Sequence, residues 1–270
     1  MMSSAAFPGA ADWGRLSTRS VEAIPEQGLL GFVAEMYAVQ LDQLAVLLVS
    51  EGEPVDSAAA QARELVARWR AAGYVESDQL SLGEPWVWAT RKGLDACGLR
   101  TKVARPAART LRHTHAVTDV RLAIQEAPSW SAGAFWRAER SMLAELEFPG
   151  RPEHVPDGEV HWPPDVGSSS GAQVLAVEVE ISRKSVVRTA AIMREVLART
   201  GDYGASATSA AQPGVAPRYA YLVYVCSYTS VRNVLEARAE VGSPLAEQIE
   251  VYDLPESAMR LNSLKRGWQS

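Results

Sequence analysis

Two glutamates in the segment LAVEVEISRKS (175–185) have the residue type and the spacing of a metal site. Glu178 and Glu180 lie two residues apart in an apolar run, and Lys184 follows. Successive side chains of a strand point to opposite faces, so both carboxylates are expected on one face. Carboxylate oxygens suit Mg²⁺ or Mn²⁺, and such an ion can activate water at a phosphodiester. The alternative is a strand with one face in water.

Two further acids upstream could join this site. Asp157, in the segment VPDGEV, stands where a neighbouring strand is expected to start. An aspartate at the start of one strand and a glutamate on the next can meet across adjacent strands. Glu139, in FWRAERSML, lies on the preceding helix and could complete the ligand set. The alternative for Asp157 is turn chemistry, because Pro-Asp-Gly is a favoured turn triplet.

The C-terminal half alternates helices and strands, which predicts an α/β or α+β fold with a mixed sheet. The segment RYAYLVYVCS (218–227) is apolar on both faces, so we expect it to be a central strand. The other expected elements are helices at 115–127, 184–200 and 230–241, a helix running into a strand within 135–146, and strands at 174–182 and 249–254.

The N-terminal third predicts three helices followed by a two-stranded hairpin. Residues 28–50 form a helical region with a break, and a helix at 57–73 carries an apolar stripe from Ala62 to Trp69. Two short strands and a small helix follow at 74–98. This order is typical of a winged helix-turn-helix, here at 28–98, whose third helix commonly enters the DNA major groove. The alternative is a protein-docking module.

Basic residues favour contact with DNA. Arg63 and Arg70 point away from the apolar stripe of their helix. The connector at 99–112 contains basic residues and no acidic ones, and such segments usually meet phosphates or an acidic surface. The alternative is a solvated loop. The expected DNA-binding residues are Arg63, Arg70, Arg100, Lys102, Arg105, Arg109 and Arg112.

The composition excludes several classes of protein. A net charge of −5 argues against a histone-like polycation, although local patches decide DNA binding. The cysteines, Cys97 and Cys226, form no CxxC motif and predict neither a zinc ribbon nor a disulfide framework. The first residues lack the pattern of a secretory signal, and no apolar run reaches membrane-spanning length, so we expect a cytoplasmic protein. Residues 1–25 are expected to be a flexible arm and 257–270 a basic tail.

The segments PDG (156–158) and EVE (178–180), followed by a cation, resemble the PD-(D/E)xK pattern of restriction-endonuclease-like nucleases. The element order also matches the common core of that fold. More widely, residues 30 to 255 resemble the replication-relaxation family of bacterial plasmids and integrative elements. Its members join a winged helix to a segment like HTHAVTDVRLAI, WRAERSM, VPDGEV and VEVEISRKS. The resemblance implies a restriction-endonuclease-like mixed-sheet sandwich at 113–256.

Carried to this chain, the resemblance implies that Asp157 and Glu178 bind Mg²⁺ or Mn²⁺, with Glu139 as an accessory metal-ligating acid. The chain departs from the pattern at Glu180, where a lysine is expected to hold the attacking water or stabilise developing charge. Glu180 could instead bind a second ion. Lys184 could return its amine to that place, or it could be a surface cation at a helix start.

That family is associated with plasmid replication and mobilisation. The implied function is metal-dependent nicking of double-stranded DNA, such as a plasmid origin, by a relaxase-like endonuclease that could act as a homodimer. The catalytic residues would be Asp157, Glu178, Glu180 and Lys184. One alternative is a regulator or replication accessory that binds DNA on an inactive, cofactor-free nuclease core. Another is a protein-docking adaptor. No membrane partner is expected.

Overall fold

A computed structural model describes residues 26–49, 55–81, 83–103, 105–127, 130, 133–146, 154–163, 173–200 and 217–254. The chain divides into two compact units between Glu126 and Ala127. The expected arm at 1–25 and the expected tail at 257–270 lie outside the described residues. No helix in the described ranges is both long and apolar enough to cross a membrane.

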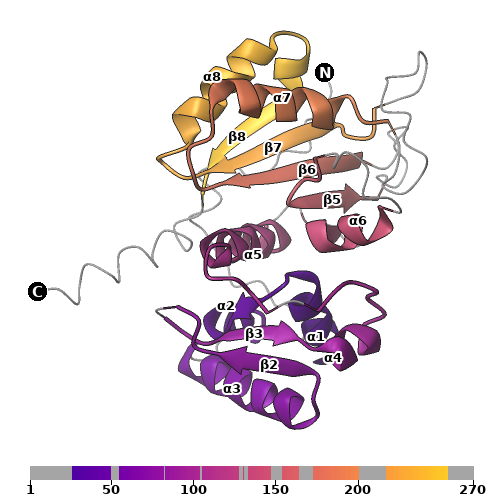
Figure 1. Ribbon diagram of the computed structural model, residues 1–270, viewed down its shortest axis with the longest axis vertical. Helices are drawn as coiled ribbons and strands as arrows, with labels where there is room; N and C mark the ends of the chain where they lie inside the picture. Colours follow the sequence, from indigo (N-terminus) through magenta and orange to yellow (C-terminus); the bar gives the residue numbers. More distant parts are fainter. Residues whose placement is uncertain are drawn as a thin grey trace, which may run out of the picture. The chain divides into compact units, whose positions relative to one another are not determined.

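The N-terminal unit combines short helices with a small antiparallel sheet (Figure 1). Its strands are β1 (Val39–Gln40), β2 (Val75–Asp78) and β3 (Trp86–Ala89), in the spatial order β1-β3-β2. Its helices are α1 (Glu26–Glu35), α2 (Leu41–Val46), α3 (Val55–Ala71), α4 (Arg91–Ala96) and α5 (Leu111–Glu126).

Helix α3 forms as its apolar spacing predicts. Ala62, Leu65, Val66 and Trp69 are all buried, so the stripe faces the core of this unit. The chain leaves the helix through Gly73, whose φ of 78° lies in the left-handed region that favours glycine. Tight packing also constrains Gly93 on α4, where an added Cβ would lie 2.1 Å from the Tyr74 carbonyl oxygen.

Helix α5 belongs to the N-terminal unit, so the division between units falls after this helix rather than at residue 113. Polar contacts explain the assignment. The side-chain amide of Gln43 donates to the Asp119 carboxylate at 2.7 Å and to the His115 carbonyl at 3.0 Å. Arg121, which is 7% exposed, forms an ion pair with Glu35 at 2.7 Å. Buried polar groups need such partners, so α5 is held by specific bonds.

The C-terminal unit contains a five-stranded mixed sheet, as its element order predicts. The spatial order is β4-β5-β6-β7-β8, with β4, β5 and β6 antiparallel and β6, β7 and β8 parallel. The strands are β4 (Phe135–Ala138), β5 (Gly158–Trp162), β6 (Gln173–Glu180), β7 (Tyr221–Cys226) and β8 (Ile249–Asp253). The helices are α6 (Glu139–Glu145), α7 (Val186–Leu197), α8 (Val231–Val241) and the 3₁₀ helix η1 (Leu245–Gln248).

One expectation for this unit is corrected. The segment 135–146 was predicted to be a helix that runs into a strand, but the order is the reverse: residues 135–138 form the edge strand β4, and the helix α6 begins at Glu139. The aromatic residues Phe135 and Trp136 favour a strand, and the stretch pairs antiparallel with β5 from Phe135 opposite His161.

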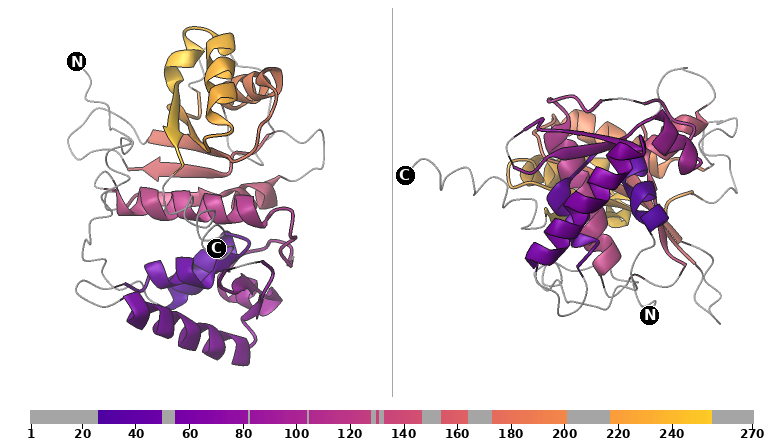
Figure 2. Two further views of the ribbon diagram at one scale, coloured as in Figure 1. Left: turned by 90° about the vertical axis from the view of Figure 1, so that its left-hand side faces the viewer. Right: turned by 90° about the horizontal axis from the view of Figure 1, so that it is seen from below.

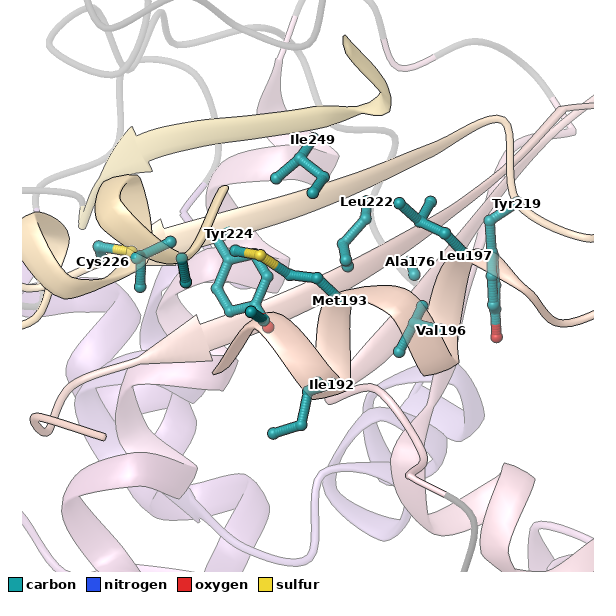
Figure 3. Close-up of a cluster of buried hydrophobic side chains, with 13 residues drawn as sticks. Ala176, Ile192, Met193, Val196, Leu197, Tyr219, Leu222, Tyr224, Cys226 and Ile249 are labelled. Carbon is teal, nitrogen blue, oxygen red and sulfur yellow. The ribbon is translucent and has the colours of Figure 1, made fainter. Parts of the chain in front are cut away.

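Helices α7 and α8 pack side by side and cover one face of the sheet (Figures 1 and 2). Ala176, Leu222 and Ile249 stand in one row across β6, β7 and β8. They pack with Met193 of α7 and Val234 of α8 in a single buried cluster, part of which is shown in Figure 3. Side chains of β6 at alternate positions from Ala176 therefore lie on the face of the sheet that α7 and α8 cover.

Gly158 at the start of β5 is required by packing. A Cβ at this position would lie 1.9 Å from the ring of Trp136, which is itself buried. Any side chain here would displace the indole or the strand. Because Asp157 immediately precedes this glycine, the close packing of Gly158 against Trp136 also constrains the position of the Asp157 backbone.

A buried carboxylate on β5 is fully compensated. Glu159 is 0% exposed, and Arg218 donates to both of its oxygens at 2.8 Å. Tyr219 donates at 2.6 Å, Arg137 donates at 3.1 Å, and His161 lies at 3.0 Å. Burial alone would raise the pKa of Glu159, but these hydrogen bonds outweigh it and hold the pKa well below its usual range.

This lowered pKa predicts how stability responds to acid. Since the folded protein favours the ionised form of Glu159, its contribution is complete above pH 4.5 and falls as the pH drops further. Glu159→Gln should lower the free energy of unfolding at pH 7 by about 3 kcal/mol. The difference from wild type, measured by urea unfolding, should shrink between pH 5 and pH 3. Glu236→Gln, in an exposed ion pair, is the control. A difference that stays constant with pH would contradict this assignment.

Candidate functional site

The carboxylates of Glu178 and Glu180 are buried. They follow Ala176 at alternate positions of β6, so they stand on the face that α7 and α8 cover. Each residue is only 4% exposed, and the neighbouring Val177 and Val179 are buried on the opposite face. The alternative of a strand with one face in water is therefore excluded, and both acids need compensation inside the fold.

The strand register brings the three acids Glu139, Asp157 and Glu178 into one row. Gly158 of β5 pairs with Val177 of β6, so one step beyond that pair Asp157 comes beside Glu178. On its other side, the Glu139 N–H donates to the Asp157 carbonyl at 3.3 Å. Of the acids predicted from sequence, these three are aligned across the ends of β4, β5 and β6.

Asp157 and Glu178 are held by specific contacts in this row. The Val179 N–H donates to the Asp157 carboxylate at 2.7 Å, which ties the turn before β5 to β6. Nε2 of His154 lies 2.5 Å from Oε1 of Glu178. The backbone N–H of His154 donates to Glu195 of α7 at 2.6 Å, so the chain at His154 is also held to α7.

Glu180 is compensated by the cation that follows it. Nζ of Lys184 lies 2.7 Å from one carboxylate oxygen of Glu180, and the Lys184 side chain is 30% exposed. Ser182 donates to the other oxygen through its N–H and its hydroxyl, both at 3.3 Å. The Asn233 amide of α8 donates to the Lys184 carbonyl at 2.9 Å. Lys184 therefore returns its amine toward the sheet, beside Glu180.

The charges in the site act on one another. Burial raises the pKa of Glu178, and the negative charge of Asp157 adds to it, while the hydrogen bond with His154 acts in the opposite direction. Burial would lower the pKa of His154, yet the contact with Glu178 raises it above the ordinary value. The pKa of Lys184 is raised in the same way, because its contact with Glu180 outweighs its burial.

Tyr224 completes the row on β7. It pairs with Glu178 in the parallel register and is 1% exposed. Burial raises the pKa of Tyr224 well above its usual value, and the charges of Glu178, Glu180 and Asp157 raise it further. Its hydroxyl has no hydrogen-bond partner among the residues that the structure describes. Figure 3 shows the ring pointing from β7 toward α7.

The donor set fits a hard divalent cation, although it is not a closed cage. Among the described residues, no group of three or more His, Cys, Asp and Glu side chains is arranged to hold a metal ion. Asp157 and Glu178 offer two neighbouring carboxylates, and Tyr224, next to Glu178 in the strand register, has a hydroxyl without a hydrogen-bond partner among the described residues. Mg²⁺ is commonly bound by one or two carboxylates and keeps several waters. The residues present therefore fit that class of ion.

The residues predicted to bind DNA all lie in the N-terminal unit and are exposed there. Arg63 of α3 contacts Glu84 at 3.4 Å, which is a weak surface pair. Arg105 is held more firmly, since its guanidinium lies 2.5 Å from the Asp78 carboxylate and over the ring of Trp88. The other residues predicted to bind DNA, all of them exposed, are Arg70, Arg100, Lys102, Arg109 and Arg112.

Sequence reasoning missed two side chains of the acidic site. His154 lies three residues before Asp157, and its only signal was its place in the EHVPDGEV segment. Tyr224 lies in the apolar segment expected to be a central strand, and its ring packs in the buried cluster. Its relation to Glu178 depends on the parallel register of β6 and β7, which no local pattern specifies.

Comparison of the chain with models of protein families, with curated proteins and with solved structures finds no match.

The ion pair at Glu180 leads to a prediction about stability. Lys184→Met should lower the free energy of unfolding by about 3 kcal/mol, because it leaves a buried carboxylate without its cation. The double variant Glu180→Gln, Lys184→Met should recover part of that loss. Arg183→Met, at the neighbouring exposed position, is the control and should change stability by less than about 0.5 kcal/mol. Equal losses for the two lysine variants, measured by urea unfolding, would contradict the pairing.

Proposed function

We propose that this protein binds DNA and cleaves it with a divalent cation, acting in the replication or mobilisation of a plasmid or integrative element. The C-terminal unit would be a restriction-endonuclease-like domain of the PD-(D/E)xK type, as the sequence resemblance implies. The observation that carries the proposal is the alignment of Asp157 with Glu178 on neighbouring strands, with Lys184 close to the next acid, Glu180.

Each residue of the site has a role in this proposal. Asp157 and Glu178 would hold Mg²⁺ or Mn²⁺, and Glu139 would assist from the start of α6. The bound cation would supply charge neutralisation and an activated water at the scissile phosphate. Lys184 would take the part of the lysine that the pattern expects at 180, since its amine already lies 2.7 Å from Glu180. Glu180 would position that amine.

The N-terminal unit supports the DNA-binding part of the proposal. Its order of helix, short strand, two helices and a two-stranded hairpin is that expected of a winged helix-turn-helix. The helix before the hairpin, α3, exposes Arg63 and Arg70. A row of basic side chains of this kind provides the phosphate contacts that dominate affinity for DNA.

A second candidate function is favoured by a specific observation. Glu178 contacts His154 and Glu180 contacts Lys184, so both acids of β6 already have a basic partner inside the fold. A site compensated in this way is stable without a metal ion. The second candidate is therefore a DNA-binding regulator or replication accessory that keeps the nuclease-like fold without its chemistry.

Metal binding distinguishes these two functions. The wild-type chain should bind Mn²⁺ with a micromolar to low-millimolar Kd by calorimetry, and Asp157→Asn and Glu178→Gln should each weaken binding at least tenfold, since each removes a charged ligand. The same variants should lose Mn²⁺-dependent nicking of supercoiled plasmid. Glu240→Gln, an exposed acid on α8, is the matched control. Absence of Mn²⁺ binding by a wild-type protein that still binds DNA would favour the regulator instead.

DNA binding has its own test. Arg70→Ala and Arg109→Ala should each weaken binding to duplex DNA and reduce the slope of log K against log salt by about 1, as expected for a lost phosphate contact. Lys92→Ala is the control, because its amine donates to the Ala72 carbonyl and lies over the Tyr74 ring. Unchanged affinity and slope in both arginine variants would instead favour a protein-docking role for this unit.

A further inference from the structure

Tyr224 is buried, and it stands next to Glu178 in the strand register. The residue is 1% exposed, and no described residue forms a hydrogen bond with its Oη. A buried hydroxyl left unpaired costs about 1–3 kcal/mol. Phenylalanine would supply the same ring to the cluster under α7 and α8 without that cost, so packing alone does not explain a tyrosine here.

A second tyrosine of the same cluster, Tyr219, has a hydrogen-bond partner for its buried hydroxyl. Tyr219, which precedes β7, is 0% exposed and donates to the Glu159 carboxylate at 2.6 Å. Both rings come from the same segment of chain and pack in the same cluster (Figure 3). They differ in that Tyr219 meets a carboxylate already held by two arginines, whereas Tyr224 stands next to Glu178.

The surroundings of Tyr224 identify the kind of partner. On one side, the register places Glu178 beside it, and Asp157 follows in the same row. On the other sides are the apolar residues of the cluster, among them Met193 and Leu222. Glu178, Glu180 and Asp157 are close enough for their charges to act on the Tyr224 hydroxyl, so a polar partner is expected on the side of these carboxylates. Two carboxylates around an octahedral Mg²⁺ or Mn²⁺ leave coordination positions that water fills.

We propose that Tyr224 is a positioning residue whose phenol oxygen accepts a hydrogen bond from a water ligand of the divalent cation held by Asp157 and Glu178. This inference rests on the proposed function and specifies how its site is completed. Water bound to a divalent cation is a stronger donor than bulk water, because the ion draws electron density from its oxygen. Because Tyr224 is buried, it would orient one such water from the interior of the fold.

Two measurements on the full chain test this role, with Mn²⁺ alone as the probe. In the metal-free protein, Tyr224→Phe should leave the unfolding midpoint unchanged or raise it, because it removes an unpaired buried hydroxyl. In calorimetry, the same variant should bind Mn²⁺ about threefold to tenfold more weakly, the loss expected for one hydrogen bond. These opposite effects on stability and on ion affinity distinguish a positioning role from a structural one.

Tyr219→Phe is the matched control. It should lower the unfolding midpoint of the metal-free protein, because it leaves Glu159 without one donor, and it should leave Mn²⁺ affinity unchanged. If Tyr224→Phe instead destabilises the metal-free protein as Tyr219→Phe does, its hydroxyl has a partner within the fold and the inference is overturned.

The outcomes also separate this inference from the proposed function. If Asp157→Asn loses Mn²⁺ binding while Tyr224→Phe binds like wild type, the metal site stands and the role of Tyr224 is overturned. If the wild-type protein does not bind Mn²⁺, both are overturned. If Asp157→Asn abolishes binding and Tyr224→Phe weakens it without loss of stability, both are supported.

Discussion

The C-terminal unit depends on the compensation of three carboxylates buried on one face of its sheet. Glu159, Glu178 and Glu180 lie on the side that α7 and α8 cover, where an isolated charge would be too costly to keep. Each is balanced by basic side chains from a different segment: Arg137 and Arg218 for Glu159, His154 for Glu178 and Lys184 for Glu180. These pairs tie the loops at the strand ends to the sheet.

Glu159 and Glu178 differ in how completely hydrogen bonds and ion pairs compensate their buried negative charge. Glu159 has donors on both oxygens, and its pKa is lowered, so it is a fixed anion of the scaffold. Burial raises the pKa of Glu178, which contacts His154 and stands in register with Tyr224, whose hydroxyl has no hydrogen-bond partner among the described residues. Perturbed acids with incomplete compensation are typical of functional sites, whereas fully paired acids are typical of structural networks.

The sequence predicted most elements because their signals are local. The apolar stripe of α3, the stop at Gly73 and the doubly apolar run of β7 each follow from periodicity or from one residue's backbone preference. The alignment of Asp157 with Glu178 could also be predicted, since it needs only two neighbouring strands. The contacts of His154 could not, because its partners Glu178 and Glu195 depend on tertiary folding. The placement of α5 depended likewise on buried polar contacts that have no sequence period.

The polar contacts of α5 also determine where this chain can be divided for study. A fragment that stopped at the end of the hairpin and α4 would keep Gln43 and Glu35 but remove Asp119 and Arg121, which they contact. Removal of α5 would also uncover the Gln43 amide and the Trp86 ring, which meets His115 edge to face. An expression boundary placed after Glu126 retains all of these contacts, so an N-terminal fragment for study should include the whole of α5.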